Sequence, residues 1–193
     1  MNQTELVEQL QRGDGSAFSK LVDEWQDMVY NTAIGIVQNP EDADDITQEV
    51  FVQVFQSIQS FKGEAKFSTW LYRITLSKAL DHEKKKKRKK RFAFVQGLFG
   101  SREDEHLHPV EFDHPGVLME KKERATALFG ALKQLPGNQR IAFTLHKLEG
   151  QSYQEIAEIM NTTLFAVESL MGRAKGNLKK ILNKHYHDKL TGK

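Results

Sequence analysis

Six side chains that could ligate a metal lie between residues 105 and 114. They are three histidines and three acids: Glu105, His106, His108, Glu111, Asp113 and His114. They lie in an aperiodic stretch and lack the fixed ligand spacing that structural and catalytic zinc sites use. The neighbouring pair Asp81 and His82 is expected to face solvent or DNA. Since no HExxH motif, Gly-rich phosphate loop or nucleophile–base arrangement occurs, we predict no enzymatic activity, no cofactor and no functional metal.

The composition indicates a soluble globular protein. The chain has 193 residues, 39% of them hydrophobic and 28% charged, enough for the core of one or two domains. It contains no cysteine, which excludes disulfides and thiolate metal sites and fits a reducing compartment. No apolar run approaches membrane-spanning length, and the polar N-terminus is unlike a signal peptide. We therefore expect a cytoplasmic protein without membrane insertion.

Eight consecutive basic residues, Lys84 to Arg91, are a strong binding signal, and we call them the basic run. Cations at a helix C-terminus stabilise it by less than about 1 kcal/mol each, and mutual repulsion offsets that gain. A polyanionic partner explains the run better, because each neutralised phosphate releases condensed counterions. The helix lacks the broad apolar face of a bilayer-surface helix, so the run favours nucleic acid over a membrane.

Residues 152–182 predict a helix-turn-helix. Ser152 and Glu155 form a capping box, Asn161 suits a left-handed helix end, and Thr162 or Thr163 can cap the second helix. The second helix has one apolar stripe, made by Val167, Met171, Ala174 and Leu178. A polar, basic outer face lies opposite this stripe, as in DNA-binding proteins. By itself the pattern also fits an ordinary helical hairpin.

The remaining chain reads as helices, which predicts an all-α fold. We expect a short helix over residues 4–11, a longer one capped by Asp14 or Ser16, a third from Pro40, and a fourth from Ser68 or Thr69. The third helix has acids in its first turns and an apolar stripe of Ile46, Val50, Val54 and Ile58, with Phe51 and Phe55 alongside. Two more helices are expected over residues 116–134 and through Ile141 to Leu148.

An aperiodic stretch separates two groups of helices. Residues 92–115 mix Gly, Pro, His and acids and are expected to form a flexible linker. Fully extended, the linker would reach at most about 75 Å, close to the ~70 Å of two turns of duplex. The prediction is an N-terminal domain over residues 1–91, a C-terminal domain over residues 116–184 and a tail over residues 185–193, with the second domain tethered to the first.

Several motifs in this order resemble one family. They are DADDITQEVFVQVF, FKGEAKFSTWLYRI, LPGNQRIAF and EGQSYQEIAEIMNTTLFAVESLMGRAK. In combination and spacing they are similar to the extracytoplasmic-function (ECF) sigma factors, which have only sigma domains 2 and 4. The resemblance covers roughly residues 15–91 and 118–182. It implies two helical domains: an N-terminal domain 2 bundle and a C-terminal domain 4 with the helix-turn-helix.

The resemblance assigns the third helix to core RNA polymerase. The family's surface for the β′ clamp would correspond to polar contacts from Asp44, Asp45, Gln48 and Glu49, with Phe51 beneath or beside them. An acidic patch that meets a basic partner suits a reversible, electrostatically steered interface. Without the resemblance, a solvated acidic face would be the simpler interpretation.

The resemblance assigns the loop FKGEAKF and the following helix to melting and reading the −10 element. A strand opens when a pocket or platform holds an unstacked base better than the duplex does. Trp70 could equally be core or a wedge. Ser77 stands where the family often has Asn, so the −10 sequence does not follow. The implied contacts are Phe61, Lys62, Gly63, Glu64, Lys66, Trp70, Arg73, Ser77, Lys78, Lys84, Lys85, Lys86, Lys87 and Arg88.

The resemblance assigns the helix-turn-helix to the −35 element. Helix N-termini at Ser152 and Thr163 would meet phosphates, and Glu168 and Arg173 could read cytosine and guanine. Arg140 would contact the DNA backbone or the polymerase β flap. The implied contacts are Arg140, Ser152, Tyr153, Thr163, Phe165, Glu168, Ser169, Arg173 and Lys175. The resemblance also implies promoter DNA and an anti-sigma factor as partners.

The alternative is a helix-turn-helix regulator that binds an operator without polymerase. It leaves the acidic third helix, FSTWLYRI and the basic run without a role. A sigma factor with core polymerase should open a promoter, whereas a regulator binds intact duplex alone.

The basic run yields a prediction about salt. Neutralising Lys84 to Lys87 as glutamines should weaken promoter binding of the polymerase complex, because fewer DNA phosphates are neutralised. The slope of log affinity against log salt should fall by up to about 0.9 for each phosphate that is no longer neutralised. Fluorescence anisotropy across a salt series measures that slope, and an unchanged slope would make the run a solvated helix end.

Overall fold

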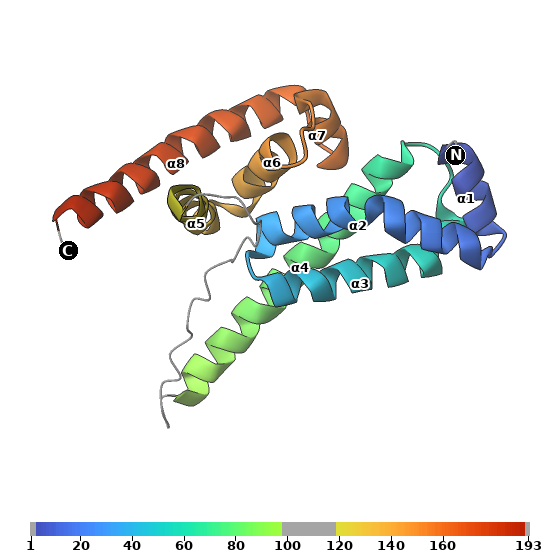
Figure 1. Ribbon diagram of the computed structural model, residues 1–193, viewed down its shortest axis with the longest axis horizontal. Helices are drawn as coiled ribbons and strands as arrows, with labels where there is room; N and C mark the ends of the chain where they lie inside the picture. The colour runs from blue at the N-terminus through green and yellow to red at the C-terminus, as the bar shows by residue number, and fades with distance from the viewer. Residues whose placement is uncertain (1–2, 98–118, 192–193) are drawn as a thin grey trace.

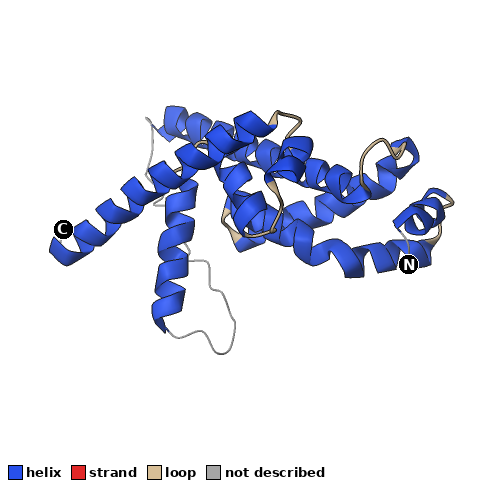
Figure 2. Ribbon diagram, turned by 90° about the horizontal axis from the view of Figure 1, so that it is seen from above, coloured by secondary structure: helices blue, strands red, loops and turns tan. Residues whose placement is uncertain are grey.

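The computed structural model describes residues 3–97 and 119–191, with side chains described for residues 3–92 and 125–187. Figure 2 shows helices joined by loops, and the described residues contain no strand. The helices are α1 (Gln3–Gln11), α2 (Gly15–Val37), α3 (Pro40–Ser57), a 3₁₀ turn η1 (Ile58–Ser60), α4 (Phe67–Gly97), α5 (Met119–Lys133), α6 (Gly137–Lys147), α7 (Tyr153–Ile159) and α8 (Leu164–Thr191). The all-α prediction is confirmed.

The N-terminal bundle consists of α1 to α4 around one apolar core. The stripe of α3 is buried as expected, with Ile46, Val50 and Val54 at most 1% exposed. They pack with Leu21 of α2 and Leu71 of α4, both fully buried. Helix α1 is held at its end by Gln11, whose amide donates to the carbonyls of Ile58 and Phe61. Burial of these faces stabilises the bundle by roughly 1.5–3 kcal/mol for each large side chain.

Local capping signals set the helix boundaries. Asp14 accepts from the backbone N–H of Ser16 and caps α2. Asn39 accepts from the N–H of Asp42, and Pro40 follows at the first helical position of α3. Helix α4 begins at Phe67, one residue before the expected start. It also continues through the basic run to Gly97, so the predicted linker begins later than residue 92. Lysine and arginine are good helix formers, and nothing before Gly97 breaks the helix.

The C-terminal unit consists of α5 to α8. Helices α5 and α8 share an apolar cluster that includes Leu132, fully buried, and Leu178. The helix-turn-helix has the predicted local geometry. Ser152 and Glu155 form the capping box of α7, and Asn161 has a φ of 50° in the turn. Thr163 accepts from the N–H of Ala166 at the start of α8.

The two units pack against each other, whereas the sequence predicts a tethered second body. In Figure 1, α5 to α8 lie together on one side of the N-terminal bundle. The buried side chains of α2, α3 and α4 are continuous with those of α6, α7 and α8. Thr144 of α6 donates to the carbonyl of Gly35 in α2 at 3.3 Å, and both residues are buried. Periodicity within each helix does not reveal this contact, which joins residues 109 positions apart.

The cap of α3 yields a stability prediction. Replacing Asn39 with Ala should lower the free energy of unfolding by about 1 kcal/mol, because the N–H of Asp42 loses its acceptor. Urea unfolding followed by circular dichroism measures the change. Asn39→Asp is the matched control, since aspartate caps as well as asparagine. An equal loss in both variants would show that the cap does not stabilise α3.

Candidate polymerase and DNA interfaces

Helix α3 presents an acidic face to solvent. Asp44, Asp45, Gln48 and Glu49 are all exposed, as their predicted role requires. Phe51 is 6% exposed and lies in the core beneath them. We call the four exposed polar residues the acidic face. It borders a shallow depression of about 380 Å³ between α3 and α4, lined by Asp45, Gln48, Glu49, Val52, Gln53, Gln56 and Lys78.

Two apolar side chains extend the acidic face, and the sequence analysis missed both. Val52 is 56% exposed and Phe55 is 65% exposed. The expectation that Phe55 lies alongside the core stripe was wrong. Its ring packs edge to face on the half-buried Phe18, at 5.5 Å between centroids. The sequence signal was the helical spacing: Val52 lies one turn after Gln48 and about two turns after Asp45, and Phe55 lies one turn after Val52. Exposed apolar residues beside acids are typical of a protein interface rather than a solvated face.

Lys78 lies beside the acidic face of α3. Its ammonium lies 3.7 Å from the carboxylate of Glu49, and it lines the same depression. The resemblance implies −10 contacts from both Lys78 and Ser77, and Ser77 is exposed. Adjacent residues on a helix point about 100° apart, so one helix can serve two surfaces.

The loop between η1 and α4 has exposed polar residues above a cluster of aromatic side chains. Lys62, Gly63, Glu64 and Lys66 are exposed, and Gly63 has a φ of 73°. Beneath them, three rings pack within 6 Å of one another: Phe61, Phe67 and Trp70, with centroid separations of 5.2, 5.6 and 5.7 Å. Phe67 also meets Trp25 of α2. Trp70 is thus a half-buried member of this cluster, packed on the core with part of its surface open.

The basic run is partly neutralised by acids of its own bundle. Lys86 pairs with Asp42 of α3 at 2.9 Å, and His82 lies 3.5 Å from the same carboxylate. Lys84 pairs with Asp81 at 3.0 Å, and Lys87 lies 3.8 Å from Glu83. Lys85 and Arg88 are exposed. The pairs made by Lys84 and Lys87 are solvent-accessible and contribute little to stability, so phosphates can compete for these lysines.

Helix α8 presents its predicted outer face to solvent. Thr163, Phe165, Glu168, Arg173 and Lys175 are exposed, and Phe165 is 77% exposed at the start of the helix. Ser169 is half-buried on the same helix. On α7, Ser152 is exposed and Tyr153 is half-buried against His146. A major groove could therefore receive the first turns of α8 without rearrangement of that unit.

Arg140, which the resemblance assigns to the DNA backbone or the polymerase β flap, is buried in this structure. It is 4% exposed, and its guanidinium donates to Glu83 of α4 at 2.5 Å. Its Nε is buried without a hydrogen-bond partner in the described part of the chain. A charge this deeply buried needs its partner carboxylate. The sequence offered no signal for this pair, because 57 residues separate its members.

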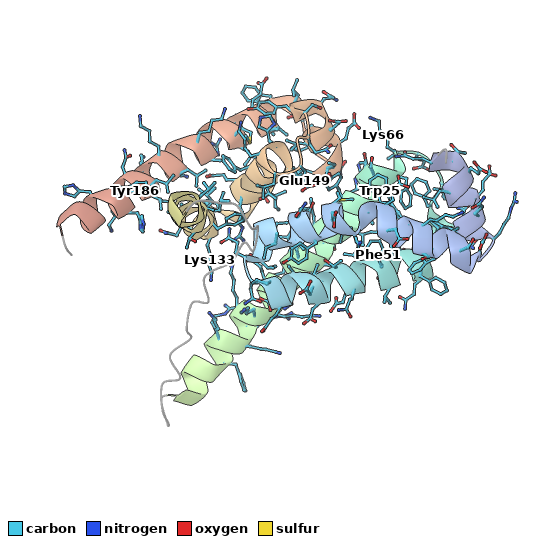
Figure 3. All side chains as sticks on the ribbon, viewed as in Figure 1. Trp25, Phe51, Lys66, Lys133, Glu149 and Tyr186 are labelled. Carbon is cyan, nitrogen blue, oxygen red and sulfur yellow. The ribbon has the colours of Figure 1, made fainter. Side chains whose placement is uncertain are left out.

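A polar cluster also joins the two units. The phenol of Tyr72 in α4 donates to Glu149 at 3.1 Å, and the amide of Gln151 donates to the phenol oxygen. Figure 3 shows Glu149 between the C-terminal helices and the N-terminal bundle. Burial raises the pKa of Glu149, and the hydrogen bond from Tyr72 partly offsets the rise. Burial also raises the pKa of the Tyr72 phenol above its usual range, with the nearby Glu149 charge adding to it.

Metal and membrane signals are absent from the described residues. Among them, no group of three or more His, Asp and Glu residues could hold a metal ion. The histidines and acids of residues 105–114 lie outside the described residues. Within the described helices, none combines the length and apolarity needed to cross a membrane.

An acidic helix face, a basic helix and an exposed helix-turn-helix on one all-α chain define a DNA-binding transcription protein. Known families match both units. The family described as Sigma-70 region 2 matches residues 21–89, and Sigma-70, region 4 matches residues 126–178. The ECF RNA polymerase sigma-E factor of Haemophilus influenzae is 35% identical over 170 residues, which are 88% of this chain and 89% of that protein. The RNA polymerase sigma-H factor of Pseudomonas aeruginosa is 32% identical over 188 residues, covering 92% of each chain. The chain belongs to the ECF family of RNA polymerase sigma factors, which is not an enzyme class.

Solved structures agree on the fold. CnrH in complex with the cytosolic domain of CnrY matches with a TM-score of 0.67 and 22% identity, covering 94% of this chain and 97% of that one. The sigma factor RpoE in complex with the anti-sigma factor NepR from Bartonella quintana matches with a TM-score of 0.60 and 22% identity, covering 86% and 96%. The two-domain helical fold predicted from the sequence is thereby confirmed.

Burial of Glu149 yields a pH prediction. Because its folded-state pKa is raised above the ordinary 4.5, its contribution to stability is complete below pH 4.5 and is lost as pH rises through the folded pKa. Glu149→Gln keeps a carbonyl acceptor for Tyr72 but cannot ionise. Relative to wild type, the variant should therefore gain stability as pH rises above 4.5.

Urea unfolding at several pH values measures this difference. Glu24→Gln, at an exposed carboxyl of α2, is the matched control. A wild-type-minus-variant difference that stays constant with pH would show that Glu149 ionises as freely in the folded protein as in the unfolded chain.

Proposed function

We propose that this sigma factor binds core RNA polymerase through the acidic face of α3 and its apolar extension, Val52 and Phe55. This proposal rests on one observation: four polar residues and two large apolar side chains are exposed together on one helix. Phe51 of the same helix is buried in the core. Charges steer the encounter with a basic partner, and the apolar residues supply desolvated contact area. The β′ clamp is the partner that the family resemblance indicates.

We propose that the N-terminal bundle engages the −10 element through the loop of residues 61–66 and the exposed side of α4. The aromatic cluster under this loop supports the role. Phe61 and Trp70 are half-buried and present ring surface on which an unstacked base could stack. Arg73 and Ser77 are exposed on the following turns of α4, and the basic run continues along the same helix toward the duplex upstream.

We propose that α7 and α8 read the −35 element, with the first turns of α8 in the major groove. The exposed Glu168 lies about one turn into the helix, and the exposed Arg173 lies about two and a half turns into it. A glutamate can accept from cytosine and an arginine can donate to guanine. The regulator alternative would use the same helix, but family membership and the acidic face both argue for a polymerase subunit.

We also propose that an anti-sigma factor regulates this sigma factor and that the protein acts in the cytoplasm. Two structurally similar proteins are known in complexes, one with an anti-sigma factor and one with a cytosolic domain. Here the acidic face and the recognition helix are both open to a protein that would cover them. We propose no catalytic activity for the chain itself, since polymerase supplies the chemistry.

The acidic face yields the test of this proposal. Asp45→Lys combined with Glu49→Lys should abolish association with core polymerase, because two attractive charges become repulsive. The melting temperature should stay nearly unchanged, since both side chains are exposed. Asp23→Lys combined with Asp27→Lys is the matched control, an exposed i, i+4 acidic pair on α2.

Association is measured by size-exclusion chromatography with purified core polymerase. Function is measured by in vitro transcription on genomic fragments with start-site mapping. Polymerase binding that survives the α3 reversal, or is lost equally in the α2 control, would refute the assignment of the acidic face.

A further inference from the structure

Helix α8 continues beyond the part of the chain that the family shares. The Sigma-70, region 4 match ends at residue 178, whereas α8 continues without a break to Thr191. Residues 179–191 lengthen the helix by about 20 Å at 1.5 Å per residue, and Figure 1 shows α8 running past α5 to the C-terminus. Three lysines of this extension, Lys179, Lys180 and Lys184, are exposed, and we call them the distal lysines.

The start of the extension is held in place by packing on α5. The apolar stripe of α8 continues from Leu178, which is 5% exposed, to the half-buried Ile181 and Leu182. All three pack in the cluster that contains the fully buried Leu132 of α5. The distal lysines lie outside this stripe. They are therefore presented by a packed helix rather than by a frayed end.

No acidic side chain neutralises the distal lysines. From Ser169 to His187 the sequence contains no aspartate or glutamate. The lysines and arginines of this stretch are Arg173, Lys175, Lys179, Lys180 and Lys184. Within the part of the chain that the structure describes, none of them forms an ion pair. The basic run of α4 differs, because Lys84, Lys86 and Lys87 each pair with a carboxylate.

Helix stability does not account for this charge. Lys175 with Lys179, and Lys180 with Lys184, are like charges four residues apart on one helix, a spacing at which they repel. The helix dipole favours cations only within the last turn, and the distal lysines precede the last turn of α8. A ligand of opposite charge explains them better.

The composition of this surface favours phosphate over a protein partner. Among the exposed side chains from residue 172 to residue 187, Tyr186 is the one large aromatic or aliphatic group. Protein interfaces are depleted of lysine and enriched in apolar groups at their centre, as on the acidic face with Val52 and Phe55. Lysine binds backbone phosphates as a point charge. Duplex DNA is also the polyanion that the first turns of the same helix are proposed to meet.

We propose that the distal lysines bind backbone phosphates of the duplex at the edge of the −35 element. The inference deepens the proposed function and rests on it, since the first turns of α8 must lie in the major groove. Lys179 and Lys184 lie about 22 Å and about 30 Å along the helix from Leu164, whereas the groove is about 12 Å wide. The distal lysines therefore reach a strand that flanks the groove. This contact is independent of sequence and extends the DNA footprint of the C-terminal unit.

The first experiment measures the phosphate contacts. Lys179→Gln, Lys180→Gln and Lys184→Gln are combined in the full chain, which is assayed with core polymerase on a mapped promoter duplex. Fluorescence anisotropy across a salt series gives the slope of log affinity against log salt. The slope should fall by about 0.9 for each phosphate that is no longer neutralised, up to about 2.7 for all three.

A second triple variant is the matched control. Lys20→Gln, Lys133→Gln and Lys147→Gln remove the same charge at exposed lysines of α2, α5 and α6, and the slope should stay that of wild type. An unchanged slope in the distal variant, or an equal fall in both variants, would overturn the proposal.

The second experiment separates phosphate contacts from base reading. The distal variant and wild type are compared on the promoter duplex and on the same duplex with a scrambled −35 element. Because backbone contacts carry no sequence information, the variant should lose affinity by the same factor on both duplexes. A loss confined to the intact −35 element would show that these lysines act through base reading, which contradicts the proposal.

The third experiment locates the extension on its partner. The chain has no cysteine, so Lys184→Cys can carry an iron chelate whose hydroxyl radicals cut nearby DNA and protein backbones. In the complex of polymerase and promoter, the cuts should fall in the duplex at the border of the −35 element. Ser19→Cys, exposed on α2, is the control and should not cut there. Cuts in a polymerase subunit but none in the duplex would assign this surface to a protein and overturn the proposal.

These outcomes distinguish the two proposals. If the wild-type chain does not bind core polymerase, the proposed function fails and the phosphate contact of α8 fails with it. If the wild-type chain opens the promoter while the distal variant keeps the full salt slope, only the phosphate contact fails.

Discussion

The close approach of α2 and α6 at Gly35 is the constraint on which the arrangement of this molecule depends. Helix α2 is buried at every position from Thr32 to Val37, so it is enclosed on all sides rather than along one stripe. Such enclosure requires small side chains where a neighbouring backbone comes near, and Ala33 and Gly35 provide them. A mid-helix glycine costs about 0.5–1 kcal/mol relative to alanine. The packing of α6 offsets that cost only when the two units are together.

The interface between the units combines apolar contacts with directional polar contacts. Apolar burial is non-directional, so it would tolerate several orientations of α6 on α2. The hydrogen bonds of Tyr72, Glu149 and Gln151 and the pair of Glu83 with Arg140 are directional and select one of them. Because these groups are polar, each can be rehydrated when the units part. An interface of this composition is specific, because its directional polar contacts select one arrangement.

Exposed acidic and basic side chains gather on different helices of the N-terminal bundle. Acids at the start of α3 complement its helix dipole and also form the outer acidic face. Asp42, also in the first turns of α3, forms an ion pair with Lys86. This pair joins the first half of the basic run to the bundle. Figure 1 shows the end of α4 extending beyond the other helices of its unit. The basic run is therefore anchored to the bundle through Lys86, and the helix that carries it extends away from the bundle.

Much of the fold and part of the candidate site followed from the sequence. The capping box at Ser152, the left-handed Asn161, the start of α3 at Pro40 and the buried stripe of α3 depend on contacts within one or two helical turns. These signals predicted the helices, the helix-turn-helix and the exposed residues of the acidic face and of α8. The motif order also predicted the sigma factor family, which the matching relatives confirm.

Only the tertiary structure decided which faces meet. It buried Arg140 on Glu83, placed Lys78 beside Glu49, left Phe55 exposed and set α7 against the loop of residues 61–66. Each of these outcomes depends on a partner from a different helix, and most depend on residues far apart in the chain. Periodicity specifies which side of a helix is apolar, but not which neighbour covers it or how closely. Which neighbour covers a helix depends on how well whole surfaces pack together. Here α6 can pack closely on α2 because Gly35 has no Cβ.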